Sequence, residues 1–408
     1  MQRLHFSLLF LVLVLGAHPL VATTYYVTLE PTMPCTSNTK GIYMFFSIQD
    51  AVNQVPAGST INVCPGTYDE QVVISQPLTL RGVSYNNSSG NSSQVVIALP
   101  STGLTTTSSI EFGTVAAQVQ VTAGPVKISN ITVDGTSGVS GCPGPVPLGI
   151  FYSSGSSGTV SEVETRNQPC GIGIGAENGS GATESVAIEN NNITAGYMGI
   201  FACSEETPST LTVSIKSNYV GPGEFGIVPY CNVAGSVSGN VVSWAGTGIY
   251  AGSPSTTVSG NTVISLAGLT GIEVDGGTEI SDNTINSGKY GLYLVLPATI
   301  TSNHISNSSG YGIFFESGSG GTTVKSNIIT QTPIGIEFGC ISTSTVSGNT
   351  INGATTTGLD FVPASFTGVN TFYNVAAATT GGCSSDTARR PEGIRKPLLG
   401  PNGTAMQR

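Results

Sequence analysis

The chain has 408 residues, of which only 9% are charged, whereas an ordinary soluble domain carries about 25%. This composition excludes a disordered chain, which would be charged and poor in β-branched residues, and a membrane bundle, because only one apolar run is long. Between the N-terminal leader and the tail at residues 382–408, the chain holds 7 cations and 21 acids. This net charge of −14 leads us to expect no nucleic-acid partner. Small, uncharged and β-branched residues predict instead many short strands joined by tight turns.

Residues 1–22 are typical of a secretory signal. Arg3 supplies a positive charge before the apolar core Leu8–Leu15, which is too short to span a bilayer, and Ala22 is a small residue at the cleavage point. An uncleaved N-terminal membrane anchor is the alternative. No second apolar stretch reaches spanning length, so we expect a secreted, extracytoplasmic chain without a membrane span after cleavage.

The segment at about 41–58 is predicted to cap the fold. Ser47-Ile48-Gln49-Asp50 resembles a capping box, and the apolar residues Ile48, Ala51, Val52 and Val55 share one helical face. A helix here would cover the first coil, whose edge would otherwise invite strand pairing. Three strands and a loop are expected to follow it: Thr60–Val63, Gln71–Ile74, Leu78–Leu80 and the loop Tyr85–Gln94.

A unit of the form V/I-x-x-N-x-I/V recurs about every 22 residues through the second half of the chain. Its asparagines are Asn191, Asn218, Asn240, Asn261, Asn283, Asn303, Asn327 and Asn349. Each is followed, eight to ten residues later, by a glycine that precedes Ile or Leu: Gly199, Gly226, Gly248, Gly271, Gly291, Gly312, Gly335 and Gly358. Weaker copies of the unit occur earlier, as at Ile128–Ile131.

The repeat predicts an all-β fold, a single-stranded right-handed parallel β-helix (solenoid) with a short N-terminal capping helix. Each unit holds two or three short alternating strands and no helical period, and a propeller blade would need about 40 residues. We assign the domain to residues 23–381, with the clearest repeats at 188–362, and residues 382–408 to a flexible basic tail. Asparagine tolerates a left-handed bend, and stacked amides can bond along the axis, so the repeated asparagines are predicted to be structural.

The eight cysteines fit an oxidising compartment. Three offsets of 28 or 29 residues suggest pairs in neighbouring coils, although the sequence alone leaves about 105 pairings open. No CxxC occurs, so a zinc or thioredoxin site is unsupported. The suggested pairs are Cys35 with Cys64, Cys142 with Cys170, Cys203 with Cys231, and Cys340 with Cys383 if the C-terminal segment folds back.

The start of the chain resembles a pectinesterase-type β-helix over about 40 residues, which include Ser47–Val52, Ile61–Glu70, Val72, Ile74, Leu80 and Gly82. The later repeats resemble the parallel β-helix repeat of the pectin-lyase-like superfamily, and are also similar to secreted surface proteins and copper-protein maturation factors. The resemblance implies the fold. It implies activity only weakly, because the pectinesterase Gln-Asp-Thr-Leu segment and the polygalacturonase Gly-His-Gly are missing, as is the epimerase Asp-Pro-His.

Metal and cofactor chemistry finds little support. His304 is the only histidine after the leader and is read as a solvated turn residue, so histidine-based copper or zinc sites lack ligands. Ca²⁺ between Glu337 and Asp360 is conceivable, but the repeat motif that would support it is absent. We therefore predict no cofactor and no metal site.

The candidate site lies two residues after each repeat glycine, where the side chains should point outward because strand side chains alternate. This column reads Phe201, Val228, Tyr250, Glu273, Tyr293, Phe314, Glu337 and Asp360, and Asp275 and Glu316 point the same way two positions further on. Glu337 and Asp360 should lie about 5 Å apart in adjacent coils, and Glu273 and Asp275 about 7 Å apart on one strand.

An exposed ladder of aromatic rings and carboxylates favours binding of a neutral or weakly charged polysaccharide. Tyr250, Tyr293, Phe314 and Glu316 would bind it, and Glu337 with Asp360, or Glu273 with Asp275, would be the catalytic pair of a glycoside hydrolase, favoured over a lyase or esterase. A solvated strand face without function, as in a non-catalytic cell-surface, adhesion or structural β-helix, is the alternative, and a degenerate pectinesterase or pectate lyase-like enzyme is the third. The shortage of cations disfavours polygalacturonate or alginate, and we expect a monomer.

Overall fold

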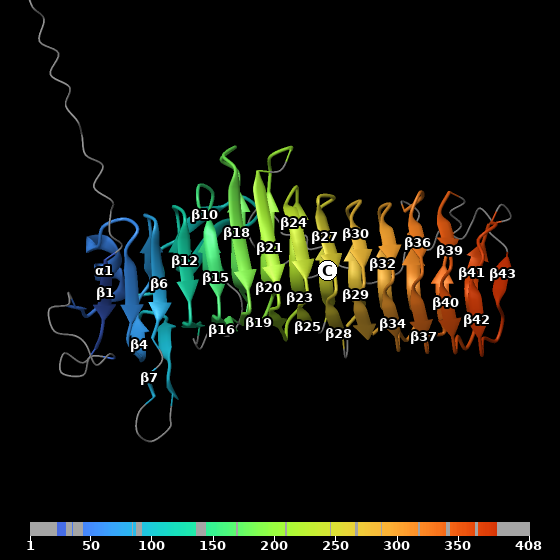
Figure 1. The fold of residues 1–408 in the computed structure, drawn as a ribbon, viewed down its shortest axis with the longest axis horizontal. Coiled ribbons are helices and arrows are strands. Elements are labelled where there is room, and N and C mark those ends of the chain that lie inside the picture. The colour runs from blue at the N-terminus through green and yellow to red at the C-terminus, as the bar shows by residue number, and fades with distance from the viewer. Residues whose placement is uncertain are drawn as a thin grey trace, which may run out of the picture.

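The computed structural model describes residues 23–29, 35, 44–83, 85–86, 92–135, 144–168, 170–208, 210–244, 246–265, 268–286, 288–316, 319–339, 343–363 and 366–381. These residues form a solenoid whose coils stack along one axis, from β1 and α1 at one end to β43 at the other (Figure 1). Each coil adds one strand to each of three long sheets, here called A, B and C. The predicted all-β parallel fold is confirmed.

Sheet A has 14 strands among the described residues, and all its pairs are parallel. In spatial order they are β2 (Met44–Phe45), β1 (Thr24–Val27), β3 (Thr60–Val63), β6 (Leu78–Gly82), β12 (Val126–Ser129), β15 (Gly158–Ser161), β18 (Glu184–Glu189), β21 (Leu211–Lys216), β24 (Ala234–Ser238), β27 (Thr256–Ser259), β30 (Glu279–Ser281), β33 (Thr299–Thr301), β36 (Thr323–Lys325) and β39 (Thr345–Ser347).

Sheet B has 13 described strands and runs beside sheet A. In spatial order they are β4 (Gly66–Asp69), β9 (Val95–Ala98), β13 (Thr132–Asp134), β16 (Glu164–Gln168), β19 (Asn192–Ala195), β22 (Tyr219–Val220), β25 (Val241–Trp244), β28 (Thr262–Ser265), β31 (Thr284–Asn286), β34 (His304–Ser306), β37 (Ile328–Thr330), β40 (Thr350–Asn352) and β42 (Thr371–Tyr373). His304 therefore begins a strand and is exposed, so its predicted place in a turn is wrong.

Sheet C carries the candidate site and has 14 described strands. In spatial order they are β10 (Thr107–Ser109), β11 (Gly113–Val121), β14 (Val146–Tyr152), β17 (Ile172–Asn178), β20 (Met198–Ser204), β23 (Phe225–Cys231), β26 (Thr247–Ala251), β29 (Thr270–Val274), β32 (Tyr290–Leu294), β35 (Tyr311–Phe315), β38 (Ile334–Glu337), β41 (Thr357–Val362) and β43 (Thr379–Gly381), with β5 (Val72–Ile74) also paired to β11. Only the β10–β11 pair of this sheet is antiparallel among the described strands.

The core is a continuous stack of inward-facing Val, Ile and Leu side chains that runs the length of the solenoid. Their full burial stabilises the fold by about 1.5–3 kcal/mol for each large side chain. Each repeat glycine is the second residue of a strand of sheet C and lies against this stack. A Cβ at Gly199 would lie 2.3 Å from Val220, and one at Gly248 would lie 2.4 Å from Val263, so a side chain at either position would collide with the core.

The repeated asparagines form one buried ladder along the bend between sheets A and B. In each step the side-chain amide and the backbone N–H of one asparagine donate to the side-chain oxygen of the next, as Asn261 does to Asn283 at 2.9 Å through both groups. The ladder runs from Asn191 to Asn370. The predicted structural role is confirmed. The left-handed residue, however, precedes each asparagine from Asn191 to Asn349, as at Asp282 (φ 56°) and Ser302 (φ 57°).

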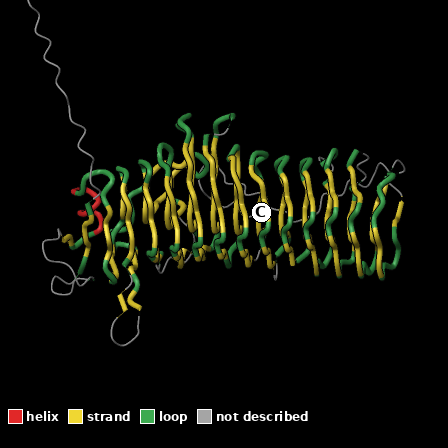
Figure 2. Tube along the Cα trace, in the orientation of Figure 1, coloured by secondary structure: helices red, strands yellow, loops and turns green. Residues whose placement is uncertain are grey.

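Helix α1 (Ile48–Gln54) closes the N-terminal end of the solenoid and is the one helix among the described residues (Figure 2). Ser47 caps it and accepts a hydrogen bond from the Asp50 N–H. Glu70, which the helix motif did not predict, accepts from the backbone N–H groups of Ile48 and Gln49, so a distant carboxylate also satisfies the first turn. The described part of the chain contains no helix long and apolar enough to cross a membrane.

Two predicted disulfides, Cys35–Cys64 and Cys203–Cys231, are confirmed. Cys170 is also disulfide-bonded, but Cys142, Cys340 and Cys383 lie outside the described residues, so their pairings stay predictions. Disulfides favour an extracytoplasmic location. The predicted loop at Tyr85–Gln94 is wrong in part, because β7 (Tyr85–Asn86) and β8 (Ser92–Ser93) pair as antiparallel strands. Residues 1–22 and 382–408 lie outside the described residues.

Candidate functional site

The predicted outward column exists on sheet C. Strand register places Tyr250 beside Glu273, Glu273 beside Tyr293, and so on along neighbouring coils. The same register continues through Phe314 and Glu337 to Asp360. Because parallel strands lie about 4.8 Å apart, each side chain of the column has a neighbour directly above and below it.

The predicted exposure of this column is wrong for six of its eight members, and Phe201 and Val228 are both 0% exposed. Glu273 is 0% exposed, Tyr250 1%, Tyr293 3% and Phe314 5%. The rings shield one another, because Tyr293 and Phe314 stack with centroids 5.3 Å apart and planes 3° from parallel. These aromatic residues belong to satellite clusters outside the main core, and the predicted contact of Tyr250, Tyr293 and Phe314 with a ligand would require side chains to move.

A second outward column, immediately before each repeat glycine, contributes residues that the sequence analysis missed. Here Tyr290 lies beside Tyr311, and their rings stack with centroids 5.3 Å apart and planes 5° from parallel. Tyr290 is buried, Tyr311 is half-buried, and Lys289 places its Nζ 5.1 Å from the centre of the Tyr290 ring. The signal was available, because tyrosine precedes the glycine in two successive repeats.

Three tyrosines each hold a carboxylate of the following coil. The Tyr250 hydroxyl donates to Asp275 Oδ2 at 2.5 Å, and the Tyr293 hydroxyl donates to Glu316 Oε2 at 2.9 Å. Tyr311 is hydrogen-bonded to Glu337 in the same way. We call the two columns and these acids the acid–tyrosine strip: Tyr250, Glu273, Asp275, Tyr290, Tyr293, Tyr311, Glu316, Glu337 and Asp360.

The electrostatics of the strip keep its tyrosines protonated. Burial, followed by the nearby Glu337 carboxylate, raises the pKa of Tyr290 and of Tyr311 to about 12. Burial and a hydrogen-bonded carboxylate raise the pKa of Tyr250 and of Tyr293 further above the usual value. The four hydroxyls therefore keep their protons at neutral pH, and those of Tyr250, Tyr293 and Tyr311 fix the direction of their acids.

Glu337 and Asp360 are register partners on β38 and β41, and both are half-buried. The Asp360 carboxylate accepts hydrogen bonds from the Phe361 N–H, at 3.1 Å, and from the Thr380 hydroxyl on β43. Phe361 itself has φ of 50°, a conformation that large side chains seldom adopt. The structure thus brings this predicted pair together on a reachable face, with Asp360 oriented by two donors.

Glu273 and Asp275 do not form the predicted open pair. Asp275 is half-buried and bonded to Tyr250, but Glu273 lies fully buried between the Tyr250 and Tyr293 coils. Strand alternation predicted the correct face for Glu273 and the wrong accessibility, because the flanking rings cover it. Glu316 is half-buried and faces outward, as predicted.

The N-terminal half of the same face is covered by the chain itself. The segment that follows β10 crosses the outer side of sheet C, where Ser109 Oγ and the Ile110 N–H donate to the two oxygens of Glu177 at 2.6 and 2.8 Å. Phe112, 0% exposed, packs edge-on against Phe201 with ring centroids 4.7 Å apart. Burial raises the pKa of Glu177, although these donors oppose the shift.

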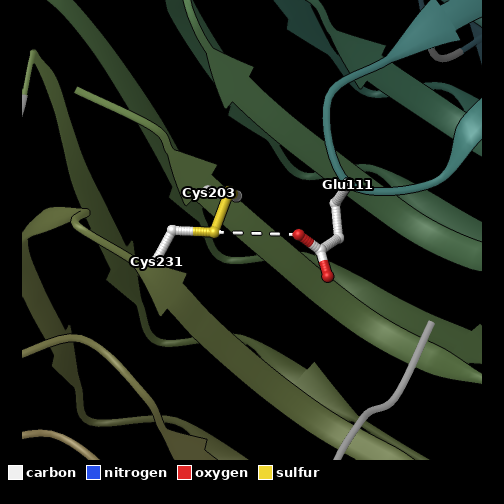
Figure 3. A group of neighbouring side chains, drawn as sticks. All are labelled: Glu111, Cys203 and Cys231. Atoms are coloured by element: carbon white, nitrogen blue, oxygen red, sulfur yellow. Dashed lines mark hydrogen bonds between the residues drawn. A yellow bond between two sulfur atoms is a disulfide. The ribbon is translucent and has the colours of Figure 1, made fainter. Parts of the chain in front are cut away.

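The same segment brings Glu111 against the Cys203–Cys231 disulfide (Figure 3). The Glu111 carboxylate lies 3.9 Å from the Cys231 sulfur. Ligand atoms of these three residues lie within 4.8 Å of one another, but the two sulfurs are joined in a disulfide and so are not thiolate ligands. The covering segment therefore lies directly against the disulfide that joins β20 to β23.

Residues 225–377 match the family model described as "Right handed beta helix region". No protein of curated function matches the chain. The protein XylC in complex with xylose is 10% identical, with a TM-score of 0.50, and the match covers 86% of either chain. The GH136 lacto-N-biosidase from Eubacterium ramulus is 12% identical over 86% of this chain and 68% of that one, with a TM-score of 0.49.

A periplasmic alginate epimerase is also similar, at 13% identity, 81% coverage of this chain, 83% of the other and a TM-score of 0.46. At such identities the likeness concerns the fold alone. The three parallel sheets define the fold as a parallel β-helix, and residues 225–377 resemble the right-handed β-helix family.

Proposed function

We propose that this protein is a secreted polysaccharide-binding β-helix, and that it binds a neutral or weakly charged glycan along the open part of the acid–tyrosine strip. The observation that carries the proposal is the line of half-buried carboxylates, Glu316, Glu337 and Asp360, beside the half-buried ring of Tyr311. Carboxylates accept hydrogen bonds from sugar hydroxyls, and an aromatic ring packs against the apolar face of a sugar. The acidic body disfavours polyanionic glycans.

The tyrosine hydroxyls orient the carboxylates of this surface, and the buried ring of Tyr293 supports the surface rather than touching the ligand. Tyr293 holds Glu316 and Tyr311 holds Glu337, so these two acids are oriented before a ligand arrives. Preorganised acceptors lose little conformational freedom on binding, which favours affinity. The similar fold that was solved with xylose supports the choice of ligand class only as an analogy.

A second function, glycoside hydrolysis, is favoured by the register of Glu337 and Asp360. Side chains on adjacent parallel strands are spaced by about 4.8 Å, close to the roughly 5–5.5 Å between the two carboxyls of retaining glycosidases. Asp360, whose carboxylate is oriented by two hydrogen bonds, is suited to act as nucleophile. Glu337 would protonate the leaving oxygen and later activate water.

A binding screen with neutral plant and bacterial polysaccharides tests the first function. We expect Glu337→Gln and Asp360→Asn each to weaken binding about tenfold or more, since a hydrogen bond to a charged group contributes about 1.5–3 kcal/mol. Glu279→Gln is the matched control, because Glu279 is exposed on sheet A and should leave binding unchanged. Absence of wild-type binding, or equal binding by all variants, would refute the glycan face.

Sugar release from the same polysaccharides tests hydrolysis separately. General acid–base groups contribute about 10²–10⁴-fold to rate, so either substitution should reduce release at least a hundredfold. Wild-type binding without release would leave the binding function and eliminate the hydrolase.

A further inference from the structure

We infer that the basic C-terminal segment of this chain, residues 382–408, docks on the acid–tyrosine strip. The strip offers a line of negative charge on one face: Asp275, Glu316, Glu337 and Asp360 are all half-buried and point away from the core. Lys289 lies at the side of this line over Tyr290 and offsets part of the charge. The docking stands on charge and chain geometry and does not depend on the proposed glycan function.

The point at which the described chain ends places this segment at the strip. β43 is the last strand of sheet C and pairs with β41, which carries Asp360. The Thr380 hydroxyl donates to the Asp360 carboxylate, and residue 381 is the last that the structure describes. Residues 382–408 therefore continue from one end of the acidic line.

The charge of the segment complements that line. Five of the 13 cations of the whole sequence lie in residues 382–408, against two acids, Asp386 and Glu392. The cations are Arg389, Arg390, Arg395, Lys396 and Arg408. Arginine suits such a surface, because its planar guanidinium can bond both oxygens of one carboxylate.

The length of the segment fits the length of the line. Four strand steps separate Asp360 from Glu273, the neighbour of Asp275, which is about 19 Å at strand spacing. Arg389 is eight residues beyond Gly381 and can reach up to about 26 Å in an extended chain. The four cations from Arg389 to Lys396 can thus contact any of the carboxylates, and the tether provides an effective concentration of about millimolar.

Docking would place guanidinium groups over Glu337 and Asp360. A ligand of the strip would then have to displace the segment, so the chain would carry its own competitor. Because the contact is largely between solvent-accessible charges, it should weaken steeply as the Debye length falls from about 10 Å at 0.1 M salt to about 3 Å at 1 M.

Hydrogen exchange of the backbone amides in residues 382–408, measured on the full chain without any glycan, tests the docking. We expect exchange at low salt at least tenfold slower than in the tail variant R389Q/R390Q/R395Q/K396Q, with the difference lost at 1 M salt. The strip variant E316Q/E337Q/D360N should also exchange faster. A control that removes three acids elsewhere, E189Q/E279Q/D282N on sheet A and the bend that follows it, should behave as wild type.

The outcomes separate the alternatives. Equal exchange in wild type and the tail variant, or equal loss of protection in the strip variant and the control, would overturn the docking. Protection that grows with protein concentration would assign the strip of a second copy as the partner and overturn docking within one chain. Since the tail variant alters no described residue, its result stands even if the strip variant fails to fold.

Discussion

The two halves of the outer face of sheet C share one backbone register but present different surfaces. From β11 to β23 the face is apolar and is covered by the segment around Phe112, which Glu177 holds in place. From β26 to β41 the same positions carry tyrosines and acids, which pair with each other, and Glu337 and Asp360 stay within reach of solvent. The repeat thus sets where a side chain points, and the side chains themselves decide whether the face is sealed.

The largest expected effect concerns the segment around Phe112 that covers the N-terminal half of the outer face. Phe112→Ala should destabilise the protein by about 3–5 kcal/mol, because Phe112 is fully buried against Phe201 and its removal leaves a cavity. Urea unfolding followed by circular dichroism measures the change. The control is Tyr373→Ala at the opposite end of the solenoid, which truncates a ring that is 55% exposed. A loss from Phe112→Ala no larger than that of the control would show that the segment does not stabilise this half.

The next largest effect is the loss of stability on removal of the Cys203–Cys231 disulfide, which lies beneath the same segment. Replacing Cys203 and Cys231 with serine should cost about 2–4 kcal/mol, since the bridge closes a loop of 28 residues. The measurement is the shift of the unfolding midpoint, with exchange of the amides around Glu111 as a local readout. If those amides keep their protection in the double variant, the disulfide does not fasten the covering segment.

The smallest expected effect is a pH dependence of stability that comes from two tyrosines in the half of the face from β26 to β41. The pKa of Tyr290 and of Tyr311 is raised to about 12, above the usual value near 10, chiefly by burial. Unfolded tyrosine loses its proton first, so the stability from these residues is complete below about pH 10 and falls as the pH rises toward 12. Tyr290→Phe and Tyr311→Phe should each make the melting temperature less dependent on pH between about 10 and 12. An unchanged slope in both variants would contradict the assignment.

The sequence predicted the repeat features because each is set locally and recurs in every coil. The asparagine ladder, the inward apolar column and the glycines all follow from one residue pattern, and the outward direction of Glu337 and Asp360 follows from strand alternation. The left-handed bend was assigned one residue too late, because the ladder asparagine is occupied by bonds to both neighbouring coils.

The features that were missed are those without a period. Stacking of Tyr293 on Phe314 depends on ring orientation, which register alone does not give, and the rings bury Glu273 with them. The covering segment joins Ser109 to Glu177 across 68 residues, and a contact formed once over that separation leaves no pattern in the sequence.

The asparagine ladder has a direction, because each amide donates to the side-chain oxygen of its C-terminal neighbour. Every internal rung is therefore interchangeable: it receives from one identical partner and gives to another. Removal or duplication of one whole coil, from one asparagine to the next, would restore the same contacts at the junction. The outer face can therefore gain or lose binding positions by whole coils, and the length of the row changes in steps of one coil rather than one residue.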